Sequence, residues 1–159
     1  MYKEYTQLED MKLMESLNPE SLTRSQKKGA LRAINPIKEK WSGKLKGRTC
    51  ADGRPQRCYI TKEDAPLPTI PLKALFTSLI IDAHIGIDVE IFVVPGAYLS
   101  ADIPEDKFIL LNIEGEFVDI MCEVNSEHKK NVRVENGVKV LHLCLLKALY
   151  GCMESALLW

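Results

Sequence analysis

The chain has 159 residues, of which 46% are hydrophobic and 27% charged, a composition typical of one globular domain and not of a disordered segment. Lysine and arginine number 21 against 22 aspartates and glutamates, so the net charge of −1 gives no overall signature of a nucleic-acid-binding protein. The first residues lack the basic start and apolar centre of a signal peptide, and no segment reaches the ~20 apolar residues that span a bilayer. We therefore expect a cytoplasmic or nuclear protein that is not secreted and has no membrane partner.

The five cysteines are odd in number and show neither CxxC spacing nor a paired-histidine motif, so reduced thiols are expected in place of a zinc site. They are Cys50, Cys58, Cys122, Cys144 and Cys152. The three histidines, His84, His128 and His142, share no ligand spacing either. His142 alternates with Leu141 and Leu143, as a solvent-facing residue of a strand would. None of the histidines is assigned any chemistry.

Two helices are predicted in the first part of the chain. Residues 5–17 carry apolar side chains at helical spacing, which predicts an amphipathic helix that ends before Pro19. Thr23 and Gln26 then have the spacing of a capping box, so a second helix is expected to run from there towards Ile34.

The rest of the chain predicts strands, one long helix and a hairpin. Residues 44–57 form the one densely basic patch, and its glycines indicate two short strands or a strand and a loop. Three apolar segments follow: a buried helix at 72–84 and strands at 89–94 and 108–113. Asn136-Gly137 is the preferred pair for a two-residue type I′ turn and predicts a hairpin over 132–143. A last helix is expected over 145–159. The pattern favours an α+β fold with a mainly antiparallel sheet and packed helices.

Three segments carry a resemblance to a known family. Residues 44–57 read KLKGRTCADGRPQR, residues 93–102 read VVPGAYLSAD, and residues 146–151 read LKALYG. In this order and spacing they resemble the reverse transcriptase domain of copia-type retrotransposons, the RNA-directed DNA polymerase of their Pol polyprotein. The resemblance covers most of the chain from about residue 31 onwards.

The resemblance implies the fingers and partial palm of a right-hand polymerase. Residues 1–40 would be a helical amino-terminal part, 41–70 a basic segment like the fingers, and 71–159 a partial palm that ends before the catalytic aspartate pair. The implied partners are an RNA or DNA template-primer, a deoxynucleoside triphosphate and other parts of the Pol polyprotein. Such a nucleotidyltransferase holds two Mg²⁺ ions on carboxylates, and these ions clamp the attacking and leaving oxygens.

The resemblance also implies nucleotide-binding roles for three residues. Lys46 and Arg48 match the fingers cations that neutralise the incoming triphosphate. Tyr98 matches the aromatic residue that lies five positions after the first catalytic aspartate and excludes a ribose 2′-hydroxyl. Taken from the residues alone, Lys46 and Arg48 also fit solvated strand cations, and Tyr98 fits a core or turn aromatic.

The sequence departs from the family at the position of that aspartate. Val93 stands there and has no side-chain oxygen for Mg²⁺, although the Val94 carbonyl matches a family ligand. Asp88 lies five residues upstream, roughly 16 Å along an extended strand, and Asp102 matches a position that is not a ligand. We therefore expect a degenerate fragment without catalytic residues or a productive Mg²⁺ site. The alternative is a non-catalytic module that binds nucleic acid or a protein partner through residues 44–57.

Overall fold

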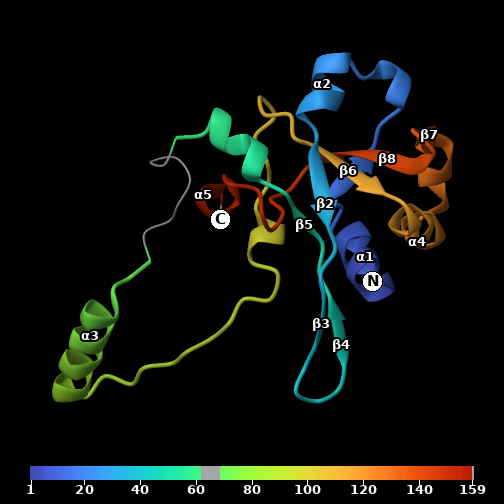
Figure 1. The fold of residues 1–159 in the computed structure, drawn as a ribbon. Helices are drawn as coiled ribbons and strands as arrows, with labels where there is room; N and C mark the ends of the chain where they lie inside the picture. The colour runs from blue at the N-terminus through green and yellow to red at the C-terminus, as the bar shows by residue number, and fades with distance from the viewer. Residues whose placement is uncertain (62–68, 159) are drawn as a thin grey trace.

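The computed structural model describes residues 1–61 and 69–158, in which a mostly antiparallel sheet carries helices on its faces (Figure 1). This mixed arrangement confirms the predicted α+β class. The main sheet has the strand order β1-β8-β6-β2-β5, and β7 pairs with the outer part of β8. The β2–β6 pair is parallel, and all other pairs are antiparallel.

The strands of this main sheet are β1 (Met14–Ser16), β2 (Leu31–Ile34), β5 (Cys50–Ala51), β6 (Leu110–Glu114), β7 (Arg133–Glu135) and β8 (Val138–Leu145). A separate two-stranded sheet consists of β3 (Ile37–Glu39) and β4 (Leu45–Gly47). The α-helices are α1 (Tyr2–Asp10), α2 (Arg24–Gly29), α3 (Leu72–Ile85), α4 (Glu116–Val124) and α5 (Ser155–Leu158). Short 3₁₀ helices lie at η1 (Pro19–Ser21), η2 (Arg54–Cys58), η3 (Tyr98–Ser100) and η4 (Ser126–Asn131).

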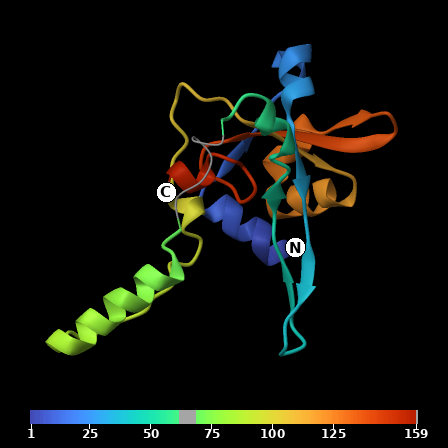
Figure 2. The same ribbon diagram turned by 60° about the vertical axis from the view of Figure 1, so that its left-hand side comes forward.

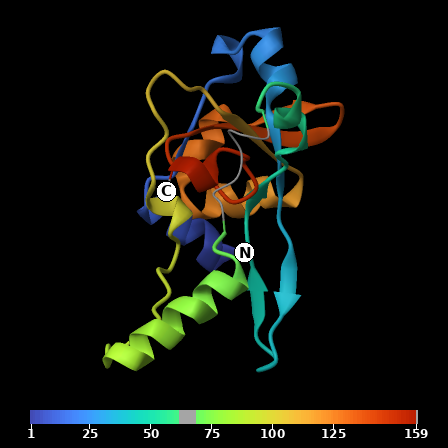
Figure 3. The same ribbon diagram turned by 90° about the vertical axis from the view of Figure 1, so that its left-hand side faces the viewer.

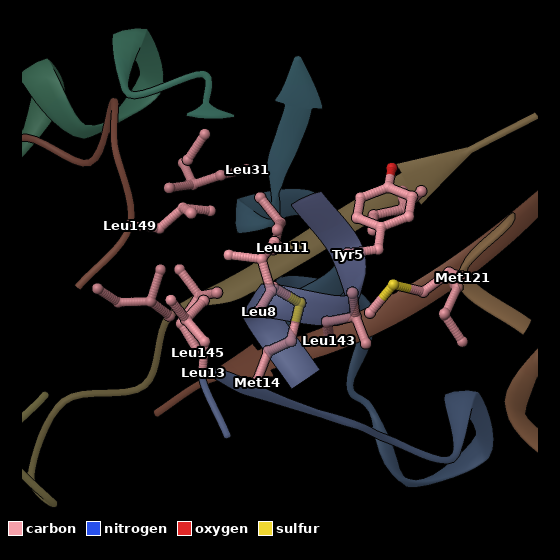
Figure 4. Packing of buried hydrophobic residues seen from close by; sticks show 14 of the residues in the cluster. Tyr5, Leu8, Leu13, Met14, Leu31, Leu111, Met121, Leu143, Leu145 and Leu149 are labelled. Atoms are coloured by element: carbon pink, nitrogen blue, oxygen red, sulfur yellow. The ribbon is translucent and has the colours of Figure 1, made fainter. Parts of the chain in front are cut away.

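The hydrophobic core lies between the central strands and two helices. Leu111 on β6 is paired in register with Leu143 on β8, and α1 adds Tyr5 and Leu8 to the same fully buried cluster (Figure 4). Met121 of α4 completes this layer. A fully buried apolar side chain of this size contributes roughly 1.5–3 kcal/mol. The core therefore fixes α1 against the sheet, which matters for the site described below.

Two local predictions are confirmed. The β7–β8 hairpin turns at Asn136 and Gly137, whose φ angles of 51° and 80° are the two positive values that a type I′ turn needs. The capping box also forms: the Thr23 hydroxyl accepts from the Gln26 N–H, and the Gln26 side chain accepts from the Thr23 N–H.

The lengths of the first two helices were predicted wrongly. α1 stops at Asp10, Lys12 takes a positive φ of 50°, and Met14–Ser16 then pairs with β8. α2 stops at Gly29, and Leu31–Ile34 becomes a strand that pairs with β6 and β5. In both places, pairing with strands distant in the sequence overrides local helical spacing.

The predicted elements of the second half need three corrections. α3 is a helix as expected, but none of its residues is buried, so the predicted core helix is wrong about burial. Residues 89–94 form no strand and are exposed. The segment from 145 onwards is not one helix: β8 continues to Leu145, and only Ser155–Leu158 is helical. The predicted strand at 108–113 is confirmed as β6, shifted to Leu110–Glu114.

His142 is not solvent-facing, because both faces of β8 are covered. Its side chain is 1% exposed, and its Nδ1 lies 2.6 Å from Asn112 Oδ1 on the neighbouring strand. Its Nε2 lies 3.4 Å from Glu135 Oε1. Alternation predicts the face correctly but cannot reveal that the second face is also buried.

The five cysteines all lie in the described part of the chain and are free thiols. Burial raises the pKa of the Cys152 thiol to about 12. Among residues 1–61 and 69–158, no helix combines the length and apolarity that crossing a membrane requires.

Candidate nucleic-acid interface

The β3–β4 hairpin extends beyond the main sheet and has two different faces (Figures 1 and 3). Its register pairs Ile37 with Gly47, Lys38 with Lys46 and Glu39 with Leu45. Residues directly opposite in an antiparallel pair share a face, and successive residues alternate between faces. The register therefore gathers the even-numbered residues on one face and the odd-numbered residues on the other.

We call the even-numbered side the basic face; its cations are Lys38, Lys40, Lys44, Lys46 and Arg48. The Lys40 N–H donates to the Lys44 carbonyl at 2.9 Å, which continues the register to the turn. Gly43 in this turn has a φ of +72°, which glycine adopts without strain. All five cations are exposed, and none forms an ion pair with another residue of the described chain.

Like charges that face each other across a strand pair destabilise it by roughly 0.2–1 kcal/mol. The Lys38–Lys46 and Lys40–Lys44 pairs therefore weaken the hairpin unless an anion lies between them. Arg54 on the neighbouring segment is different: it binds Asp52 at 2.5 Å, and these hydrogen bonds lower the pKa of the Asp52 carboxyl to about 2. The hairpin therefore carries the uncompensated positive charge of this region.

A groove of about 770 Å³ lies over the basic face. Four cations, Lys38, Lys40, Lys46 and Arg48, line it together with one carboxylate, Glu39. Trp41 from the turn also lines the groove, and its side chain is fully exposed. Cations beside an exposed indole provide both charge for phosphates and a planar surface for a base. The groove therefore has the chemistry of a single-stranded nucleic-acid site.

The base of the hairpin is fixed to α1 by a partly buried hydrogen-bond network. The Thr49 N–H donates to Glu4 Oε1 at 3.0 Å, and the Thr49 hydroxyl donates to Asn35 Oδ1 at 3.0 Å. The Tyr5 hydroxyl donates to the same Asn35 oxygen at 3.2 Å, and burial raises the pKa of the Tyr5 phenol. Because Tyr5 is a core residue, this network orients Arg48 relative to the rigid body.

Lys46 and Arg48 also line a second hollow, a cleft of about 390 Å³. Val93 and Tyr150 also line it. The Arg48 guanidinium lies 5.6 Å from the centre of the Tyr150 ring, within the range of a cation–π contact. The Tyr98 ring lies 5.5 Å from that of Tyr150 at an angle of 56°. One cation and two tyrosines thus form a continuous contact at this cleft.

The structure brings the predicted site residues together in part. Lys46 and Arg48 share both hollows, whereas Tyr98 reaches the cleft through Tyr150 and does not line it. Val93 lines the cleft with its side chain 84% exposed. Glu4 is the one carboxylate among the described residues that line it, and no group of three potential metal-binding side chains occurs in residues 1–61 and 69–158.

Sequence reasoning missed Lys38, Lys40 and Trp41, because it placed the start of the basic patch at Lys44. The sequence nevertheless contains a pattern that predicts this face. Residues 38–46 read KEKWSGKLK, with alternating lysines on both sides of a Trp-Ser-Gly turn. Folding such a stretch at its glycine places all four lysines on one face of a hairpin.

The three segments that carry the family resemblance meet at the cleft. Residues 44–57 contribute Lys46 and Arg48, residues 93–102 contribute Val93, and residues 146–151 contribute Tyr150. A comparison of the chain with models of protein families, with curated proteins and with solved structures gave no match.

Proposed function

We propose that this chain binds single-stranded nucleic acid through the basic face of its β3–β4 hairpin. The observation that carries the proposal is the alignment of five uncompensated cations on one face, next to an exposed tryptophan. A near-neutral chain that concentrates its cations in this way gains a local field that its net charge of −1 does not reveal. Phosphates would lie along the lysines, and a base would stack on Trp41.

We further propose that the chain is related to the fingers and partial palm of copia-type retrotransposon RNA-directed DNA polymerases. Support comes from the meeting of the three similar segments around one cleft, with Lys46 and Arg48 placed for a triphosphate. In this proposal Tyr98 acts through its contact with Tyr150. The natural ligands would be a template-primer and a deoxynucleoside triphosphate, met in the cytoplasm or nucleus together with other parts of a Pol polyprotein.

The donor set of the cleft does not fit the Mg²⁺ ions that such polymerases use. Two ions must share several carboxylates, and the lining offers Glu4, whose Oε1 already accepts from the Thr49 N–H. Val93 adds no oxygen from its side chain, and Lys46 and Arg48 repel a cation. The proposed role is therefore binding without catalysis.

Titration of a fluorescent single-stranded oligonucleotide at several salt concentrations tests the binding proposal. We expect log Kd to rise linearly with log[salt] with a slope of up to about 3.5, because each of up to five phosphate contacts releases roughly 0.7 counterion. Trp41→Ala should weaken binding about tenfold with an unchanged slope, because stacking contributes roughly 1–3 kcal/mol per base and carries no charge. Trp41→Phe, which keeps an aromatic face, is the matched control. Salt-independent affinity, or equal affinity of the Trp41→Ala and unmodified chains, would contradict the proposed interface.

Primer extension on an RNA template with Mg²⁺ or Mn²⁺ tests the absence of catalysis. We expect no product from the unmodified chain and none from Val93→Asp, since one new aspartate beside Glu4 does not assemble a site for two ions. Oligonucleotide binding by the same preparations serves as the control for folding. Nucleotide incorporation by the unmodified chain would show that residues other than those described at the cleft hold the metal.

A further inference from the structure

The segment of residues 72–94, which we call the arm, consists of α3 and the extended stretch that follows it. No residue of α3 is buried, and Figures 1 and 2 show the helix apart from the main sheet. The most exposed large apolar side chains include Phe76, Ile80, Ile85, Ile91, Phe92 and Val93. At roughly 150 Å² for a large side chain, the arm presents on the order of 1,000 Å² of apolar surface. Monomers rarely expose more than a few hundred Å² in one patch, whereas a stable interface takes about 800 Å² from each partner.

The extended stretch at 87–94 has two distinct faces if it joins a sheet. Asp88 and Glu90 fall on one face, and Ile87, Val89 and Ile91 fall on the other, because successive side chains alternate. All five side chains are exposed, and the stretch pairs with no strand of the described chain. If it joined a sheet, the stretch would therefore present an acidic side and an apolar side.

The β3–β4 hairpin is complementary to this stretch on both faces. Its basic face would meet Asp88 and Glu90, and its opposite face exposes Ile37 and Leu45. Any register that sets the acids beside the lysines also sets Ile87, Val89 and Ile91 beside the apolar face, because the two faces alternate with the same period. One register of the stretch against the hairpin therefore pairs its acids with the lysines and its apolar side chains with Ile37 and Leu45.

We propose that residues 87–91 of one copy of this chain add as a strand to the β3–β4 hairpin of a second copy. The added strand would form backbone hydrogen bonds with the hairpin edge, and the side chains would set its register. Each copy has one such stretch and one such hairpin, so two copies can exchange them reciprocally in a closed, two-fold dimer. A second copy is favoured because the apolar surface that the arm exposes is close to the area that one partner of a stable dimer buries. The added strand and a nucleic acid would compete for the basic face, but dimerisation is measured without nucleic acid, so the dimer can fail or hold whatever the outcome of the binding proposal.

A charge-swap experiment tests the dimer by analytical ultracentrifugation of the full chain. The first variant, Asp88→Lys with Glu90→Lys, has a basic strand and a basic hairpin. The second variant replaces Lys38, Lys40, Lys44 and Lys46 by glutamate, so that it has an acidic strand and an acidic hairpin face. We expect the unmodified chain to dimerise with concentration and each variant alone to associate at least tenfold more weakly. An equimolar mixture should regain dimers to within about threefold of the unmodified affinity, because both exchanged contacts then join opposite charges.

Recovery in the mixture also shows that both variants are folded, since unfolded chains would not restore a specific contact. Circular dichroism of each variant gives the same control independently. An unmodified chain that stays monomeric at every concentration would overturn the proposal, including the case in which the stretch binds its own hairpin. Self-association that neither variant changes would also overturn it, because it would place the contact on the apolar side chains of α3 alone.

Discussion

A chain with glutamine in place of Lys38, Lys40, Lys44 and Lys46 is expected to bind single-stranded nucleic acid several hundredfold more weakly than the unmodified chain. Each lysine that neutralises a phosphate contributes about fivefold in affinity near 0.1 M salt, since the counterion slope is roughly 0.7 per contact. The loss should shrink as salt rises, and the slope of log Kd against log[salt] should fall towards the value for Arg48 alone. The measurement is the same oligonucleotide titration at several salt concentrations.

The fourfold variant should not lose stability, which separates a lost binding surface from a lost fold. Its changes remove two pairs of facing like charges, so the hairpin should gain a few tenths of a kcal/mol and the melting temperature should stay level or rise. The matched control is Lys130→Gln with Lys139→Gln, which removes two cations that are paired with Glu127 and Asp119. If the control weakens binding as much as the fourfold variant, the basic face is not the site.

Gly151→Ala is expected to destabilise the fold by about 3 kcal/mol or more. A Cβ at this position would lie 2.0 Å from the Ala51 carbonyl oxygen, a contact with backbone that no side-chain rotation relieves. The substitution also forces alanine into a φ of +91° and disturbs the 2.7 Å hydrogen bond from the Ala51 N–H to the Tyr150 carbonyl. Since natural domains are stable by only about 5–15 kcal/mol, urea denaturation should show a large shift of the midpoint.

Gly137→Ala is the matched control, because it introduces the backbone strain of a positive φ without the close contact that alanine would make at position 151. Gly137 also has a positive φ, +80°, but a Cβ there would meet no atom within 4 Å. Its replacement should cost only about 1 kcal/mol, which is the penalty for the left-handed conformation. Equal losses for the two alanine variants would mean that the approach of Gly151 to Ala51 is not rigid. Tyr150 would then not be held at the cleft as described.

The elements that the sequence predicted correctly depend on neighbours in the chain. Asn136-Gly137 fixes a turn through its own backbone preferences, and Thr23 with Gln26 caps a helix within four residues. The elements that were predicted wrongly depend on distant partners. Met14–Ser16 is a strand because β8 lies beside it, and no pattern within residues 5–17 contains that information.

The cations of the candidate site could be predicted from the sequence, whereas its tertiary contacts could not. Lys46 and Arg48 were identified by resemblance, and the alternation that identifies Lys38 and Lys40 is visible in the sequence once a turn is placed at Gly43. The contact of Tyr150 with Arg48 and Tyr98 was not predictable, because it joins three segments through tertiary packing. The exposure of residues 89–94 was likewise not predictable, because a β-branched run of this kind is typical of a buried strand.

The position of β1 at the side of β8 has a consequence for how the chain acquires its structure. Met14 pairs with Leu145, a residue far from it in the sequence. Closing the loop between the two strands costs conformational entropy, and contacts of this kind form slowly. During synthesis, the apolar side of α1 cannot pack against β8 until the residues between them have been made, at about 5–20 residues per second. The β7–β8 hairpin is local and forms within microseconds of its completion. The pairing of β1 therefore forms late in folding, although β1 leaves the ribosome before β8.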